Sequence, residues 1–109
     1  MLEPRLKAEL LVQALLRHAQ AAARAAYVTR RGDAQSGAVL VKHVGPGFRC
    51  TVFQTAFADD GARRWLPMTG DLPVAEAEAD AFVARQCRYD EDLWVVEIEA
   101  PEGWSPEAP

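Results

Sequence analysis

The spacing of apolar residues near the start of the chain predicts an amphipathic helix from Arg5 to about Ala23. Pro4 suits the first turn of this helix, where a backbone N–H has no partner inside the helix. The polar side includes Arg17 and Arg24. The apolar side consists of Leu6, Leu10, Leu11, Ala14, Leu15, Ala19 and Ala22. We therefore expect this helix to pack against the core of the protein.

The periodicity then changes from helical spacing to alternation, which predicts strands. A strand-like run from Ala26 to Arg31 leads into a loop bounded by glycines. A clearer strand from Ala38 to Val44 and a returning strand from Arg49 to Phe57 flank Gly45-Pro46-Gly47, a sequence typical of a turn. These two strands should form a hairpin, with alternate residues on opposite faces of the sheet.

A second turn and a short strand follow the hairpin. Asp59-Asp60-Gly61 is typical of a turn, and the proline that ends the strand from Arg63 to Pro67 confines it to an edge or an end of the sheet. A second helix is then predicted from Pro73 to about Cys87, with acidic first turns and arginines near its end, which complements the helix dipole. Its buried stripe is Ala75, Ala79, Phe82 and Val83.

The last predicted strand runs from Leu93 to Glu99, after the connection Asp90-Glu91-Asp92. Trp94 begins one apolar face, and the opposite face begins with Leu93 and Val95. Because both faces of its first half are apolar, we place this strand in the interior of the sheet. The whole pattern predicts an α+β fold: a mostly antiparallel sheet of four to five strands with two helices, in the order α-β-β-β-(β)-α-β.

The length and composition of the chain indicate how many domains it forms. The chain has 109 residues, of which 50% are hydrophobic and 26% charged, and these values fit one domain with a single core. We assign residues 1–100 to this domain and expect 101–109 to be a loose tail, from which Trp104 can fold back onto the body. No apolar run approaches the roughly 20 residues that cross a bilayer, and no signal peptide is evident, so we expect a cytoplasmic protein.

The net charge of the chain limits the kinds of partner that it can be expected to bind. The chain has 12 Lys and Arg against 16 Asp and Glu, a net charge of −4 that disfavours general nucleic-acid binding. Local clusters of cations can still bind an anion, because guanidinium groups match carboxylates and phosphates. The candidate ligand-binding residues are Arg31, Lys42, Arg64 and Arg85. The favoured alternative is that the cations near the sheet pair with acidic residues such as Asp90-Glu91-Asp92 in a surface network.

Signals for metals, cofactors and covalent catalysis are weak. His18 and His43 stand alone in the sequence, although a composite of His43 with Cys50 across the hairpin is conceivable. Cys50 and Cys87 fit small buried residues of a reducing compartment. Neither a hydrolase serine elbow nor a phosphate-binding glycine loop is present. We therefore assign no catalytic residue, no metal site and no cofactor.

Charged, glycine and tryptophan positions form an ordered set along the chain. The set is Arg31-Gly32-Asp33, Ser36-Gly37, Val41-Lys42, Gln54, Asp60-Gly61, Arg63-Arg64-Trp65, Glu76 to Asp80, Arg85-Gln86 and Asp90-x-Asp92-Leu93-Trp94-Val95-Val96-Glu97. It resembles the DUF1491 family, small bacterial proteins of unknown function found mainly in alphaproteobacteria. The last segment is the most specific, and Glu91 stands where the family pattern has proline. The resemblance implies a compact domain of helices and strands and no established activity.

Three hypotheses about function follow. The favoured one is a non-catalytic binding or adaptor domain, monomeric or homodimeric, whose four candidate cations hold an anionic small molecule or an acidic protein segment. The second is a small metal-dependent or carboxylate-based hydrolase that works through Asp33, Asp90 or Asp92. The third is a structural, homo-oligomerising protein that buries Trp65 or Trp104 against a partner.

Overall fold

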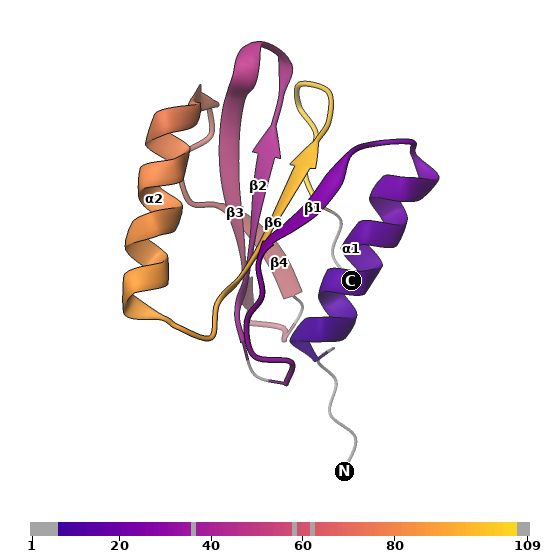
Figure 1. Cartoon of the computed structure of the whole chain (residues 1–109), viewed down its shortest axis with the longest axis vertical. Helices are drawn as coiled ribbons and strands as arrows, with labels where there is room; N and C mark the ends of the chain where they lie inside the picture. Colours follow the sequence, from indigo (N-terminus) through magenta and orange to yellow (C-terminus); the bar gives the residue numbers. More distant parts are fainter. Residues whose placement is uncertain (1–6, 36, 58, 62, 107–109) are drawn as a thin grey trace.

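Two helices lie on opposite sides of a sheet, so the chain forms three layers (Figure 1). The computed structural model describes residues 7–35, 37–57, 59–61 and 63–106. The elements are α1 (Ala8–Ala21), β1 (Ala26–Arg30), β2 (Val39–Val44), the 3-10 turn η1 (Pro46–Phe48), β3 (Arg49–Phe57), β4 (Arg63–Pro67), β5 (Val74–Ala75), α2 (Glu76–Tyr89) and β6 (Trp94–Glu99). Within these described ranges, no helix is both long and apolar enough to cross a membrane.

The strands lie in the spatial order β1-β6-β2-β3-β4, and β5 pairs with the start of β3. The α+β fold is confirmed, as are the interior position of the last strand and the edge position of β4. The sheet is larger than expected, with six strands, and it is mixed because β6 runs parallel to β2. The parallel pair arises because α2 carries the chain back across the sheet before β6 begins.

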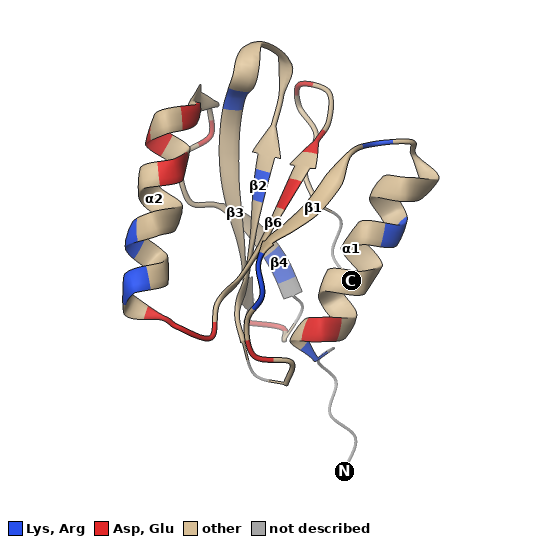
Figure 2. Ribbon diagram, in the orientation of Figure 1, with Lys and Arg blue, Asp and Glu red and all other residues tan. Residues whose placement is uncertain are grey.

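The helix boundaries differ slightly from the sequence prediction. The α2 helix begins at Glu76, because Val74 and Ala75 are first taken into the sheet as β5. The residues before Lys7, where the first helix was expected to begin, lie outside the described part of the chain. Acidic residues occupy the first turns of α2 and basic residues its end (Figure 2), so the expected match to the helix dipole is confirmed.

Different helices bury the two faces of the sheet. Along β2, Val39 and Val41 face α1, whereas Leu40 and Val44 face α2, as the alternating pattern predicted. The core on the α1 side is Ala8, Leu11, Val12, Leu15, Ala19, Val39, Val41, Phe53, Trp94, Val96 and Ile98. The core on the α2 side is Leu40, Val44, Cys50, Val52, Ala79 and Leu93. β2 supplies residues to both cores, whereas β6 supplies the α1-side core and Leu93, just before it, the α2-side core. Each fully buried aliphatic side chain stabilises the fold by about 1.5–3 kcal/mol.

The segment after β6 folds back over the α1 side of the sheet. Ala100 extends the sheet pairing, since its N–H donates to the Val44 carbonyl at 3.1 Å. Trp104 then packs on His43, with 5.1 Å between ring centroids, and edge-on against Phe53 at 6.4 Å. The α1 helix packs over β1 and β6. Trp104 therefore covers β2 and β3, the part of this face beside the helix.

The loop between β1 and β2 is held against the turn that precedes β6. The Asp33 N–H donates to the Asp92 carbonyl at 3.0 Å, and the Trp94 indole N–H donates to the Asp33 carbonyl at 2.7 Å. Arg30 donates to the Leu93 carbonyl at 3.2 Å. These bonds join two segments that are far apart in the sequence. The second of them, at Asp92 to Trp94, belongs to the most specific part of the family resemblance.

Gly32 and Gly37 allow this close approach. A side chain at Gly32 would meet the Asp92 carbonyl oxygen and come within 2.6 Å of Trp94 Cδ1. A side chain at Gly37 would meet the same carbonyl oxygen. An added Cβ at either position would clash because two backbone segments touch there.

Replacing Gly32 with alanine should lower the free energy of unfolding by about 2 kcal/mol or more, because the new methyl group forces the two segments apart. Gly103→Ala is the matched control, since nothing lies within 4 Å of its added Cβ and only its positive φ of 83° is strained. That control should cost about 1 kcal/mol. Urea denaturation measures both, and equal losses would contradict the close contact at Gly32.

Candidate functional site

Three carboxylates surround Lys42 on the α2 side of the sheet. Its Nζ atom lies 2.7 Å from Asp80 Oδ1, 2.9 Å from Glu76 Oε2 and 3.3 Å from Glu97 Oε1. Glu76 and Asp80 stand one helical turn apart at the start of α2, and Glu97 is the partner of Lys42 in the parallel pair of strands. The Lys42 side chain is only 8% exposed, so this group of charges is largely withdrawn from water on the lysine side.

These contacts raise the pKa of Lys42 above its ordinary value of 10.5. Burial by itself favours the neutral amine and lowers the pKa, but hydrogen bonds to Asp80 and Glu76 and the negative charge of Glu97 outweigh it. Lys42 is therefore a cation at neutral pH, and carboxylates take up its donors. Its role is to fix α2 to the sheet.

Arg31 and Arg64 each pair with a carboxylate at the surface. Arg31 lies 3.3 Å from Glu9 of α1, and its guanidinium also lies 5.4 Å from the centre of a Trp94 ring. Arg64 lies 3.5 Å from Asp60. These four charged side chains are all at least 40% exposed, so each pair contributes about 1 kcal/mol or less to stability.

Arg85 lies on α2, with its guanidinium 5.8 Å from the centre of the Phe82 ring. The structure thus places Arg31, Lys42, Arg64 and Arg85 in four separate contacts, three of which involve carboxylates. This arrangement matches the surface charge network that the sequence suggested as the alternative. It is less like a single anion site shared by all four residues.

Two of the three aspartates considered for a hydrolase, Asp33 and Asp90, accept hydrogen bonds within turns. Asp90 Oδ1 accepts the Asp92 N–H at 3.0 Å, and Asp33 Oδ2 accepts the Gln35 N–H at 3.0 Å. Such bonds are typical of the turns that Asp favours. Across the described ranges, no group of three or more His, Cys, Asp or Glu side chains is arranged to hold a metal ion.

His43 and Cys50 do not form a composite site. His43 lies on the α1 side under Trp104, and Cys50 lies in the core on the α2 side. The register explains the separation, because His43 pairs with Thr51 across the hairpin and its neighbour Cys50 points to the other face. Cys50 is fully buried, and burial raises the pKa of its thiol, so it is a poor nucleophile.

The end of α1 places Arg24 beside a cavity. Ala23 adopts a left-handed backbone with a φ of 57°, which turns the chain back over the last turn of the helix. The Arg24 N–H then donates to the Ala19 carbonyl at 2.8 Å. This turn satisfies a carbonyl at the helix end and positions the Arg24 side chain over the α1 face of the sheet.

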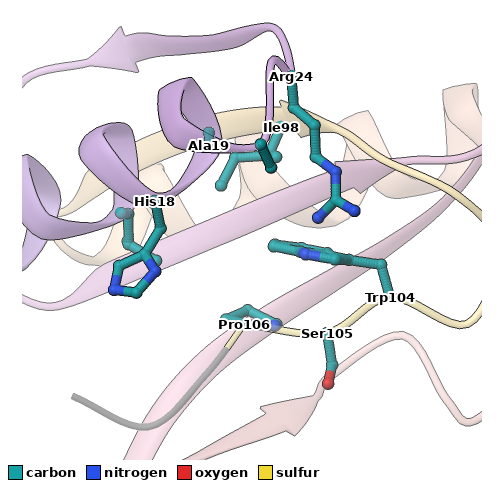
Figure 3. A pocket seen from close by; sticks show the side chains of 9 residues that line it. His18, Ala19, Arg24, Ile98, Trp104, Ser105 and Pro106 are labelled. Atoms are coloured by element: carbon teal, nitrogen blue, oxygen red, sulfur yellow. The ribbon is translucent and has the colours of Figure 1, made fainter.

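A cavity of about 190 Å³ lies between α1 and the returning tail (Figure 3). In this view Arg24 reaches toward the Trp104 ring, and His18 lies across the opening from it. The lining residues are Leu15, His18, Ala19, Ala22, Arg24, Ile98, Trp104, Ser105 and Pro106. Mostly apolar walls with a few polar groups are characteristic of small-molecule sites.

Arg24 is a cation without a carboxylate partner in the part of the chain that the structure describes, and no Asp or Glu lines its cavity. A half-buried guanidinium in this position attracts an anion and can bind a carboxylate through two N–H groups. Sequence reasoning placed Arg24 only on the polar side of the first helix. It missed the cavity because the opposite wall comes from Trp104, at the far end of the chain.

Comparisons with known proteins agree on one family. The family model DUF1491, described as a protein of unknown function, matches residues 6–106. A crystal structure of a DUF1491 family protein from Caulobacter crescentus CB15 is 38% identical, with a TM-score of 0.80 over 88% of this chain and 89% of that one.

Two structures determined in solution agree with it. An NMR structure of a DUF1491 family protein from Caulobacter crescentus CB15 is 39% identical, with a TM-score of 0.77 over 91% of this chain and 89% of that one. A protein from A. tumefaciens is 35% identical, with a TM-score of 0.75 over 95% of this chain and 99% of that one. No curated protein matches the chain.

Replacing Lys42 with methionine should lower the free energy of unfolding by about 2 kcal/mol at neutral pH, because three carboxylates are left without their cation. Since the folded-state pKa of Lys42 is raised, its contribution is complete below about pH 10.5 and is lost as the pH rises through the folded-state pKa. The difference between the unaltered chain and Lys42→Met should therefore be constant from about pH 7 to 9 and shrink above about 10.5. Urea denaturation at these pH values checks this.

The control is Lys7→Met, which removes the other lysine of the chain from an exposed position. Its stability should stay within about 0.5 kcal/mol of the unaltered chain at every pH. Equal stabilities of Lys42→Met and Lys7→Met at neutral pH would contradict a role for Lys42 in fixing α2.

Proposed function

We propose that this chain, which belongs to the DUF1491 family, is a non-catalytic binding domain that holds a small organic anion in the cavity between α1 and Trp104. The guanidinium of Arg24, which has no carboxylate partner among the described residues, supports this proposal most directly. Arg31, Lys42 and Arg64 already face carboxylates, whereas no described Asp or Glu lines the cavity at Arg24.

The lining of the cavity defines the class of ligand. Arg24 can hold a carboxylate in a bidentate fashion. Leu15, Ile98 and the Trp104 ring offer surface for an apolar or aromatic body. At about 190 Å³ the cavity is smaller than the roughly 300–1,000 Å³ of pockets for drug-sized molecules, so the ligand is small. A short carboxylic acid with a branched or aromatic body fits these features.

An acidic protein segment bound by Arg31, Lys42, Arg64 and Arg85 is the other partner that the sequence suggested. A segment of this kind would have to displace Glu9 from Arg31 and Asp60 from Arg64. It would gain little from Lys42, whose ammonium is already enclosed. The cavity at Arg24 requires no such exchange, and we therefore favour the small anion.

Benzoate is a suitable probe, with benzamide as the uncharged compound of nearly the same shape. We expect benzoate to bind in the millimolar range, at about −4 kcal/mol, and to shift the NMR signal of the Trp104 indole N–H. Arg24→Gln should weaken benzoate binding by about fivefold or more, because the charge-assisted hydrogen bonds are lost. Benzamide should bind more weakly and be insensitive to this substitution.

Arg17→Gln is the matched control, because it removes the same charge from an exposed position on α1 that does not line the cavity. It should leave benzoate binding unchanged. The proposal fails if Arg24→Gln and Arg17→Gln bind benzoate equally well, or if about 10 mM benzoate causes no saturable shift in the unaltered chain.

A further inference from the structure

A second hollow lies on the other side of Trp104. A cavity of about 350 Å³ lies between the tail, the end of the hairpin and the segment after β4. A neighbouring cavity of about 290 Å³ shares four of its lining residues, so the two form one groove. The shared residues are His43, Leu72, Pro73 and Glu102.

His43 is a buried polar residue that lines this groove. Its side chain belongs to a residue that is only 4% exposed, and Nε2 lies 3.0 Å from the Ala100 carbonyl oxygen. Because a carbonyl can only accept, Nε2 must carry the proton. In the neutral ring Nδ1 is then an acceptor, and it has no partner in the part of the chain that the structure describes.

The charge of the groove is opposite to that of the cavity at Arg24. Asp71 and Glu102 line the larger part, and none of its described lining residues is Lys or Arg. Neither carboxylate has a basic partner within the described ranges. Arg49 lines the neighbouring part, where it donates to the Pro73 carbonyl at 2.9 Å.

We infer that this groove is a second binding site, for a primary amine on an apolar or aromatic body. The ammonium group would donate to Asp71, Glu102 and the free nitrogen of His43, which together offer acceptors and negative charge. The Trp104 and Phe53 rings would take the apolar body. This inference is independent of the proposed function, because the two cavities use different charged residues.

Benzylamine is the probe, and benzyl alcohol is the uncharged compound of matching shape. We expect benzylamine to give saturable NMR shifts in the ¹⁵N-labelled full chain at the Trp104 indole and at the backbone around His43 and Glu102. The double variant Asp71→Asn with Glu102→Gln should weaken benzylamine binding by about fivefold or more. Benzyl alcohol should bind more weakly and respond little to the double variant.

The control is Glu78→Gln with Glu91→Gln, which makes the same change in net charge at two exposed positions outside the groove. It should leave benzylamine binding unchanged. The inference is overturned if the two double variants bind benzylamine equally, if benzyl alcohol binds as tightly as benzylamine, or if about 10 mM benzylamine gives no saturable shift. Arg24→Gln should leave benzylamine binding intact, so failure of one site is distinguishable from failure of the other.

Discussion

The insertion of β6 between β1 and β2 is the constraint on which the rest of this structure depends. The strand is hydrogen-bonded on both edges, antiparallel to β1 and parallel to β2, and both of its faces are buried along most of its length. Its start brings Trp94 against the loop at Asp33, and its end carries the chain to Ala100 and on to Trp104. Both cavities exist because this strand delivers the tail to the α1 side of the sheet.

The same pairing explains how the charges are divided. Because β6 runs parallel to β2 in this register, Glu97 stands beside Lys42, and the start of α2 closes the group with two more carboxylates. The Lys42 ammonium is thus paired with carboxylates of the protein itself. Arg24 lies on the opposite side of the sheet, beside apolar residues and Trp104, and no described carboxylate lines its cavity. The distinction rests on which partners the fold supplies, since both residues are cations.

Trp104 separates two hollows of different chemistry. On one side Arg24 offers donors and positive charge, and on the other Asp71 and Glu102 offer acceptors and negative charge. The indole ring contributes apolar surface to both, while its packing on His43 and Phe53 holds it in place. A single aromatic side chain from the tail therefore lines both cavities, and the charged residues around it give each cavity its own chemistry.

The local pattern of the sequence was sufficient for both helices and for every strand except β5, and for the faces of the central strands. Alternation along Val39 to Val44 and Leu93 to Glu99 determined which residues enter each core, because neighbouring side chains of a strand must point to opposite faces. The ordered motifs were sufficient for the DUF1491 family. Only the tertiary structure decided which charges are paired and where the cavities lie. Lys42 meets Glu97, and Arg24 meets Trp104, across long stretches of sequence, and such contacts depend on strand order and register, which no local periodicity records.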